Sequence, residues 1–217
     1  MTDPRTLGRE SVERIRARLA GLGQTPEPPD RADAAVLILL RSGSTGPEVL
    51  AEQRAERAGD PWSGHVGLPG GRTDPSDRSL TETVLRELRE EVGILPSSLH
   101  ETPRLFDIRR ARPSGVRVAV FAERLAEESD VLPRGRSTEV DATFWFPLQA
   151  LDQATRRIRN TAAGEMPVEV VEFEGHVIWG FTLRVLQDFA TWLTSSDPAP
   201  REAPNEAPQS PSRPPKV

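Results

Sequence analysis

The order of apolar and polar residues predicts short strands separated by a few amphipathic helices. Residues 34–41 (AAVLILLR) form a continuous apolar run with the length of a buried strand, and residues 47–54 (PEVLAEQR) follow a Gly/Ser/Thr turn as its neighbour. Further strands are expected at 104–111, 115–125, 140–148 and 168–180, the last range divided by a Glu-Gly turn. Helices are expected at 6–23, 79–92 and 181–193. Because no regular strand–helix–strand period appears, the pattern predicts an α/β sandwich around a mixed β-sheet rather than a doubly wound fold.

Composition divides the 217 residues into three parts. Residues 1–32 are expected to hold the N-terminal helix and a Pro-rich linker, and residues 33–195 hold the remaining predicted strands and helices. Residues 196–217 are rich in Pro, Ser, Glu and Ala. Such a segment buries too little apolar surface to offset the entropy lost on ordering. The sequence therefore predicts one folded domain followed by a disordered tail.

Charge and cysteine content exclude several classes of function. The net charge is −5 and no block of basic residues occurs, which argues against a nucleic-acid-binding groove. A phosphorylated substrate stays compatible with this charge, because a bound divalent cation supplies local positive charge. The absence of cysteine excludes disulfides, thiolate zinc sites and cysteine nucleophiles. With no signal peptide or 18-residue apolar run, we expect a cytoplasmic protein without a membrane partner. The oligomeric state stays open, a homodimer included.

The predicted helix at 79–92 carries an unusual cluster of acidic residues. Glu87, Glu90 and Glu91 fall within about 100° of one helix face, at the edge of its apolar stripe. Carboxylates at these spacings repel one another. One interpretation is a solvated helix face. The other is a ligand set for a hard divalent cation such as Mg²⁺, completed by a backbone carbonyl of the Gly70-Gly71 turn.

The loop and helix together resemble the Nudix box, G-x5-E-x7-R-E-U-x-E-E-x-G-U, where U is a bulky aliphatic residue. Residues 86–94 (RELREEVGI) match its second half in full. The first half has Asp77 in place of glutamate and is one residue longer. That loop, PGG-x-x-D-x-x-D at 69–77, is similar to the loop of the coenzyme A pyrophosphatase branch. Just upstream, His65 and Leu68 stand where that branch has Gln and Phe. The resemblance covers about residues 33–193.

The resemblance implies a Nudix-type α/β/α sandwich and metal-dependent hydrolysis of a nucleoside diphosphate linked to another group. The groups that it implies as ligands of Mg²⁺ or Mn²⁺ are Glu87, Glu90, Glu91 and a carbonyl at Gly71. It implies that Arg86 orients a glutamate and that Glu90 or Glu91 is the general base, with Glu139 as a further candidate base or ligand.

The substrate implied by the branch is coenzyme A or an acyl derivative. Candidates for contact with the substrate's phosphates are Arg54, Arg57, Arg72 and His65, and an ordinary structural or surface role stays open for each. Two alternatives stay open as well. One is hydrolysis of another nucleotide, such as ADP-ribose, NADH, a dinucleoside polyphosphate or an oxidised dNTP. The other is a non-catalytic Nudix module that only binds its ligand.

Overall fold

The large β-sheet of the protein is mixed and has a buried central strand. The computed structural model describes residues 13–22, 31–56, 63–111, 114–126, 138–161 and 164–196. The strands of this sheet are β1 (Ala34–Ser42), β2 (Pro47–Arg54), β3 (Val66–Gly67), β4 (Gly70–Arg72), β5 (Arg104–Arg110), β6 (Arg117–Arg124) and β7 (Val140–Pro147). Strand β1 pairs in parallel with β6 and antiparallel with β2 and β4, and β7 pairs with β2. This arrangement confirms the predicted mixed sheet.

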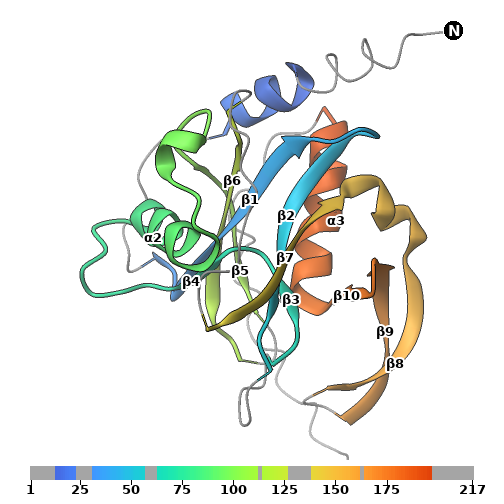
Figure 1. Cartoon of the computed structure of the whole chain (residues 1–217). Helices are drawn as coiled ribbons and strands as arrows, with labels where there is room; N and C mark the ends of the chain where they lie inside the picture. Colours follow the sequence, from blue (N-terminus) through green and yellow to red (C-terminus); the bar gives the residue numbers. More distant parts are fainter. Residues whose placement is uncertain are drawn as a thin grey trace, which may run out of the picture.

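Strand β1 is apolar from Ala34 to Leu40 because both of its faces are covered there. Leu37 and Leu39 belong to a core cluster that includes α2 (Leu80–Val92). Ile38 and Leu40 belong to a second cluster that includes α3 (Gly180–Thr194). Side chains alternate between the faces of a strand, so a strand covered on both faces needs apolar residues at every position. The two helices lie on opposite sides of the sheet (Figure 1).

A smaller antiparallel sheet joins the α3 side of the molecule. It consists of β8 (Thr155–Thr161), β9 (Gly164–Phe173) and β10 (His176–Trp179), in the order β10-β9-β8. Glu174 and Gly175 form the turn between β9 and β10 with φ angles of 49° and 85°, as the Glu-Gly pair predicted. Strand β8 was not predicted, because it is rich in arginine and its one large apolar residue, Ile158, is 65% exposed.

The first described helix is part of the main core. Residues 13–20 are helical, and Ile15, Leu19 and Leu22 are buried in the cluster that contains α3. The Arg18 guanidinium lies 4.2 Å from the centre of the Trp192 ring, and its Nη2 donates to the Trp192 carbonyl at 2.6 Å. The described part of the predicted N-terminal helix is therefore docked on α3, and residues 6–12 and the predicted linker lie outside the described residues.

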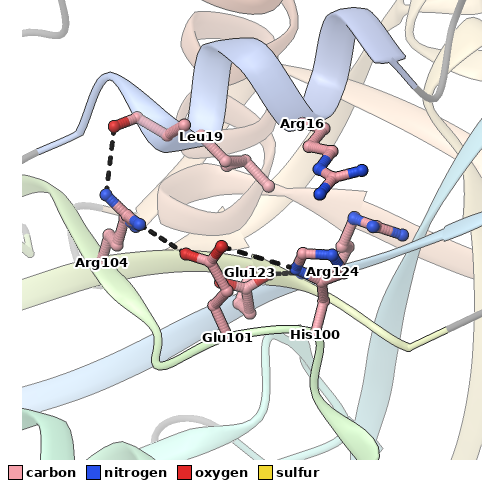
Figure 2. A pocket seen from close by; sticks show the side chains of 8 residues that line it. Arg16, Leu19, His100, Glu101, Arg104, Glu123 and Arg124 are labelled. Atoms are coloured by element: carbon pink, nitrogen blue, oxygen red, sulfur yellow. Dashed lines mark hydrogen bonds and ion pairs between the residues drawn. The ribbon is translucent and has the colours of Figure 1, made fainter.

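A small pocket lies beneath this helix. It is lined by Arg16, Leu19, Ala20, His100, Glu101, Arg104, Glu123 and Arg124 (Figure 2). Arg104 spans the pocket by donating to the Ala20 carbonyl at 3.0 Å and to Glu101 Oε2 at 2.5 Å.

Two 3₁₀ turns, η2 (Pro96–Ser98) and η3 (Leu148–Gln153), complete the described elements. No helix within these ranges has the length and apolar character needed to cross a membrane.

Candidate active site

Helix α2 begins and ends close to the predicted residues. The Ser79 side chain caps its N-terminus by accepting from the backbone N–H of Glu82 at 3.2 Å. Only this half of a capping box forms, because the Glu82 carboxylate accepts instead from the Arg78 backbone N–H at 2.8 Å. Gly93 ends the helix in the left-handed region, with φ of 71°, and donates to the carbonyl of Arg89. These ends fix the face that α2 turns toward the sheet.

The three glutamates of α2 occupy three different environments. The side chain of Glu90 is 51% exposed, that of Glu87 is 14% exposed, and Glu91 is buried at 4%. The helical wheel placed all three along the edge of the apolar stripe, whereas Glu91 lies inside it. Burial raises the pKa of Glu87 and, more strongly, that of Glu91, to about 9. The exposed fraction of the three side chains thus falls from Glu90 through Glu87 to Glu91.

The diglycine loop lies directly against these carboxylates. The Gly70 backbone N–H donates to Glu91 Oε2 at 2.9 Å. Gly70 has φ of 148°, and a Cβ there would collide with the carbonyl of Ala35 on β1. A Cβ on Gly71 would collide with the carboxylate of Glu87. Glycine is therefore needed at Gly70 for β4 to approach β1, and glycine at Gly71 leaves the space that the Glu87 carboxylate occupies.

Arg86 ties this loop to the helix. Its Nε and Nη2 donate to the two oxygens of Asp77 at 3.1 and 3.0 Å, and Nη2 also donates to the Arg72 carbonyl at 3.0 Å. Its Nη1 donates to Glu87 Oε1 at 2.8 Å and to Glu90 Oε2 at 3.4 Å. Arg86 thus orients Glu87 and Glu90, whereas Glu91 is held by its hydrogen bond from Gly70.

Asp77 and Asp74 have structural roles in the loop. Asp77 is buried and accepts from Thr83 Oγ1 at 2.8 Å and from the Asp74 backbone N–H at 2.9 Å, in addition to Arg86. Hydrogen bonds from Arg86 lower the pKa of Asp77 to about 2. Asp74 is exposed, and its Oδ1 accepts from the backbone N–H and hydroxyl of Ser76.

A fourth carboxylate, Glu52, lies beside Glu91 and was not singled out from the sequence. Glu52 is 2% exposed, and its Oε2 has no hydrogen-bond partner in the described part of the chain. Burial raises its pKa to about 7, and its charge is the second cause, after burial, of the raised pKa of Glu91. Two buried carboxyl groups therefore face each other between β2 and α2.

The alternation of strand β2 explains why Glu52 points toward α2. Leu50 belongs to the core cluster of α2, whereas Val49 and Ala51 belong to the cluster of α3. Because side chains two residues apart share a face, Glu52 lies on the same side as Leu50. The sequence does show that Glu52 is two residues from the apolar Leu50 and therefore shares its face of the strand. Predicting that Glu52 belongs to the site also requires knowing which face of β2 each helix covers.

Two further candidate residues, Glu139 and Arg54, act on the cluster through their charges. Glu139 immediately precedes β7, and its negative charge contributes to the raised pKa of both Glu52 and Glu87. Arg54, on β2, acts in the opposite direction on Glu52 and Glu91. Both therefore belong to the electrostatic surroundings of the cluster.

Two of the candidate phosphate-binding residues lie at the edge of the loop. Arg72 is exposed at the end of β4, and its carbonyl accepts from Arg86. His65 is half-buried, with its ring 4.9 Å from that of Trp179 in an edge-to-face contact, and its carbonyl accepts from the Arg54 N–H at 3.0 Å. Arg57 lies outside the described residues.

The chemistry of this donor set fits a hard divalent cation. Such ions take carboxylate and carbonyl oxygens, and this site offers several carboxylates, one of which has a buried oxygen with no partner among the residues that the structure describes. Within the described ranges, no three His, Asp or Glu side chains form a preassembled ion site. In this arrangement Glu87 and Glu90 pair with Arg86, and Glu91 pairs with Gly70.

Comparison with known proteins identifies the family. Residues 30–164 match the NUDIX domain. The human mitochondrial coenzyme A diphosphatase NUDT8 is 32% identical over 198 residues, which cover 88% of this chain and 80% of that protein. The uncharacterized Nudix hydrolase NudL of Yersinia enterocolitica is 31% identical over 131 residues, which cover 59% of this chain and 65% of that protein.

A solved structure shows the same fold. The NUDIX domain of Shewanella oneidensis NrtR, complexed with ADP ribose, has a TM-score of 0.50 and 21% identity, over 74% of this chain and 87% of that one. The helix at 13–20 precedes the matched NUDIX region, although it packs into the same core. The match over residues 30–164 and the similarity to NUDT8 show that the chain belongs to the Nudix hydrolase family, whose members cleave pyrophosphate bonds in small nucleotide substrates.

Proposed function

We propose that the protein is a Mg²⁺- or Mn²⁺-dependent diphosphatase of coenzyme A or acyl-coenzyme A. Water adds to one phosphorus of the pyrophosphate and the bridging P–O bond breaks, giving adenosine 3′,5′-bisphosphate and (acyl-)phosphopantetheine. The observation that carries the substrate assignment is the 32% identity to a coenzyme A diphosphatase over 88% of this chain. The loop with Asp77, similar to that of the coenzyme A branch, agrees with it.

Metal dependence is proposed from the carboxylates around the diglycine loop. The residues proposed to hold the ion are Glu87, Glu90, Glu91 and the carbonyl of Gly71. When bound, a divalent ion supplies Lewis-acid stabilisation of the pyrophosphate oxygens and a water of lowered pKa. In the structure, burial and like charge raise the pKa of Glu91, so ionising this carboxyl without a cation costs free energy. A cation relieves that cost.

The glutamates are assigned different tasks from their exposure. Glu90 is half exposed and therefore accessible to water and substrate, which suits proton transfer from the attacking water. Glu91 is buried and hydrogen-bonded to Gly70, which suits a fixed ligand. Arg86 is a positioning residue, because it contacts Glu87 and Glu90 through one nitrogen while Asp77 holds its other side.

The electropositive side chains near the loop are proposed to bind the substrate's phosphates. Arg72 is exposed beside the diglycine turn, and Arg54 lies near Glu52 and Glu91 on β2. A guanidinium forms paired hydrogen bonds with phosphate oxygens, so either residue fits this task. His65 and Arg57 stay candidates from the sequence.

A substrate comparison tests the proposal. The ratio kcat/KM is measured by chromatography for coenzyme A, acetyl-coenzyme A, ADP-ribose, NADH, a dinucleoside polyphosphate and 8-oxo-dGTP, each with Mg²⁺ and with Mn²⁺. We expect the coenzyme A compounds to be preferred and all turnover to stop in EDTA. Preference for another nucleotide would contradict the substrate assignment alone. Binding of nucleotide without any turnover would favour the non-catalytic alternative.

A further inference from the structure

Glu52 is a buried acidic residue that belongs to none of the motifs described above. It lies on β2, opposite Gly67 of β3 on one side and Thr143 of β7 on the other. It is 2% exposed, and Oε2 has no hydrogen-bond partner within the described ranges. A carboxylate buried in this way is unfavourable unless another group compensates it. The burial of the Glu52 carboxylate therefore requires a compensating group in the site.

The charges that face Glu52 are mostly negative. The charges of Arg54, Glu87 and Glu139 act on it, and Glu91 forms a side-chain hydrogen bond with it. Three of these four groups are carboxylates from α2 and the start of β7, and the single arginine acts on Glu91 as well as on Glu52. Because Arg86 already pairs with Glu87, Arg54 is left with Glu52, Glu91 and Glu139, and one arginine does not balance three carboxylates in a partly buried space. The site lacks positive charge at the place where β2 faces α2.

Two kinds of partner relieve this excess charge, a shared proton or a cation. A proton shared between Glu52 and Glu91 joins one oxygen of each group. Oε2 of Glu52, which is buried and has no partner in the described part of the chain, gains nothing from that proton. A divalent cation accepts lone pairs from several carboxylate oxygens and removes two negative charges at once. The unpartnered oxygen therefore favours the cation.

We propose that Glu52 is a ligand of the metal centre, contributed by strand β2 from outside the Nudix motif. The inference rests on the proposed metal dependence of the same site. It adds a ligand on the sheet to those on α2, so that an ion bridges the two layers between which it lies. A ligand on a central strand is held more rigidly than one on a loop, which favours a fixed ion position.

The test is Mn²⁺ binding to the full-length protein, measured without substrate from the electron paramagnetic resonance signal of free Mn²⁺. Glu52→Gln keeps the size of the side chain and removes its charge. We expect it to weaken Mn²⁺ binding at least about tenfold, as loss of a group that supports a metal does. Its melting temperature in EDTA should be equal to or above that of the wild type, since a like charge disappears.

Glu123→Gln is the matched control. Glu123 is a buried strand glutamate at 3% exposure that lines the pocket beneath the N-terminal helix (Figure 2), and the charges that act on it are those of Glu101, Arg104 and Arg124 rather than those of α2. We expect wild-type affinity for Mn²⁺ in this variant. Equal weakening in both variants would overturn the proposal, because the effect would not belong to the site.

The remaining outcomes are also decisive. Wild-type affinity in Glu52→Gln would overturn the role of Glu52 and leave metal dependence intact. If the wild type binds no Mn²⁺, metal dependence itself fails, and the assignment of Glu52 fails with it. Should Glu52→Gln not fold, Glu52→Asp keeps the charge but shortens its reach. Weaker Mn²⁺ binding in that variant supports ligation, and unchanged binding contradicts it.

Discussion

The guanidinium of Arg86 and the carboxylate of Asp77 form a two-point ion pair, with Nε–Oδ1 at 3.1 Å and Nη2–Oδ2 at 3.0 Å. The pair joins the loop that follows β4 to the middle of α2. The same guanidinium orients Glu87 and Glu90. The longer, Asp-containing first half of the motif therefore has a structural purpose, which is to hold the arginine that aligns the glutamates.

Asp77→Asn should weaken both stability and turnover. It removes the charge from a buried, hydrogen-bonded pair, and we expect the free energy of unfolding to fall by about 1–3 kcal/mol. Urea denaturation measures this change. Asp74→Asn is the control, since Asp74 is exposed and its Oδ1 accepts from the backbone N–H and hydroxyl of Ser76 rather than from Arg86. It should change the free energy of unfolding far less than Asp77→Asn does.

The stabilisation from Asp77 should depend on pH in the acid range. Its pKa in the folded protein is lowered to about 2, so the ionised form is favoured by folding. The contribution is present above the ordinary value of about 3.9 and is lost as the pH falls toward about 2. The difference in unfolding free energy between wild type and Asp77→Asn should therefore shrink over that window. A constant difference would show that the carboxylate charge is not responsible.

Gly71→Ala should reduce turnover more than stability. The added Cβ collides with the end of the Glu87 side chain rather than with backbone, so Glu87 moves while the fold adjusts. We expect kcat to fall at least about tenfold, because a displaced ligand is misaligned in the transition state. Gly67→Ala is the control, since no atom lies within 4 Å of a Cβ there. Wild-type kcat in Gly71→Ala would contradict the placement of Glu87 in the site.

Glu90→Gln should remove most turnover and leave folding unchanged. Its side chain is half exposed and its contacts with Arg86 and Arg89 are long, at 3.4 and 3.8 Å, so it contributes little to stability. Steady-state kinetics and thermal melting of the same preparation separate the two effects. Glu172→Gln, at 55% exposure and also paired with an arginine, is the control in the small sheet. A marked fall in melting temperature without loss of kcat would make Glu90 structural.

The N-terminal helix should contribute to stability as part of the core. Leu19 is 4% exposed within the α3 cluster, and Leu19→Ala is expected to cost about 2–5 kcal/mol of unfolding free energy. Leu95→Ala, at a position that is 51% exposed, should cost far less. Equal small effects in urea denaturation would show that the helix is dispensable for the fold.

The sequence predicted the elements whose pattern reports burial directly. The apolar run of β1, the Ser79 cap and Gly93 stop of α2, and the Glu-Gly turn of β9 and β10 are all local features. Strand β8 was missed because it is largely exposed and held by pairing with β9 rather than by an apolar face. Because strand pairing depends on two segments, the sequence of one strand alone does not reveal it.

The site divides in the same way. The cluster on α2 and the adjacent glycines could be predicted, since their spacing along the chain already places them together. Glu52 could not, because its role depends on the face of β2 that α2 covers and on the burial that follows. The docking of the helix at 13–20 likewise depends on contacts with α3, such as that between Arg18 and Trp192. These two residues are 174 positions apart in the sequence.

The most direct test of the central claim is product analysis by mass spectrometry after incubation with coenzyme A. The wild type with Mg²⁺ or Mn²⁺ should yield adenosine 3′,5′-bisphosphate and phosphopantetheine. The wild type in EDTA and Glu90→Gln with metal should yield neither. Intact coenzyme A in every sample would contradict the substrate assignment. Equal cleavage in EDTA would contradict a metal-dependent site built on these glutamates.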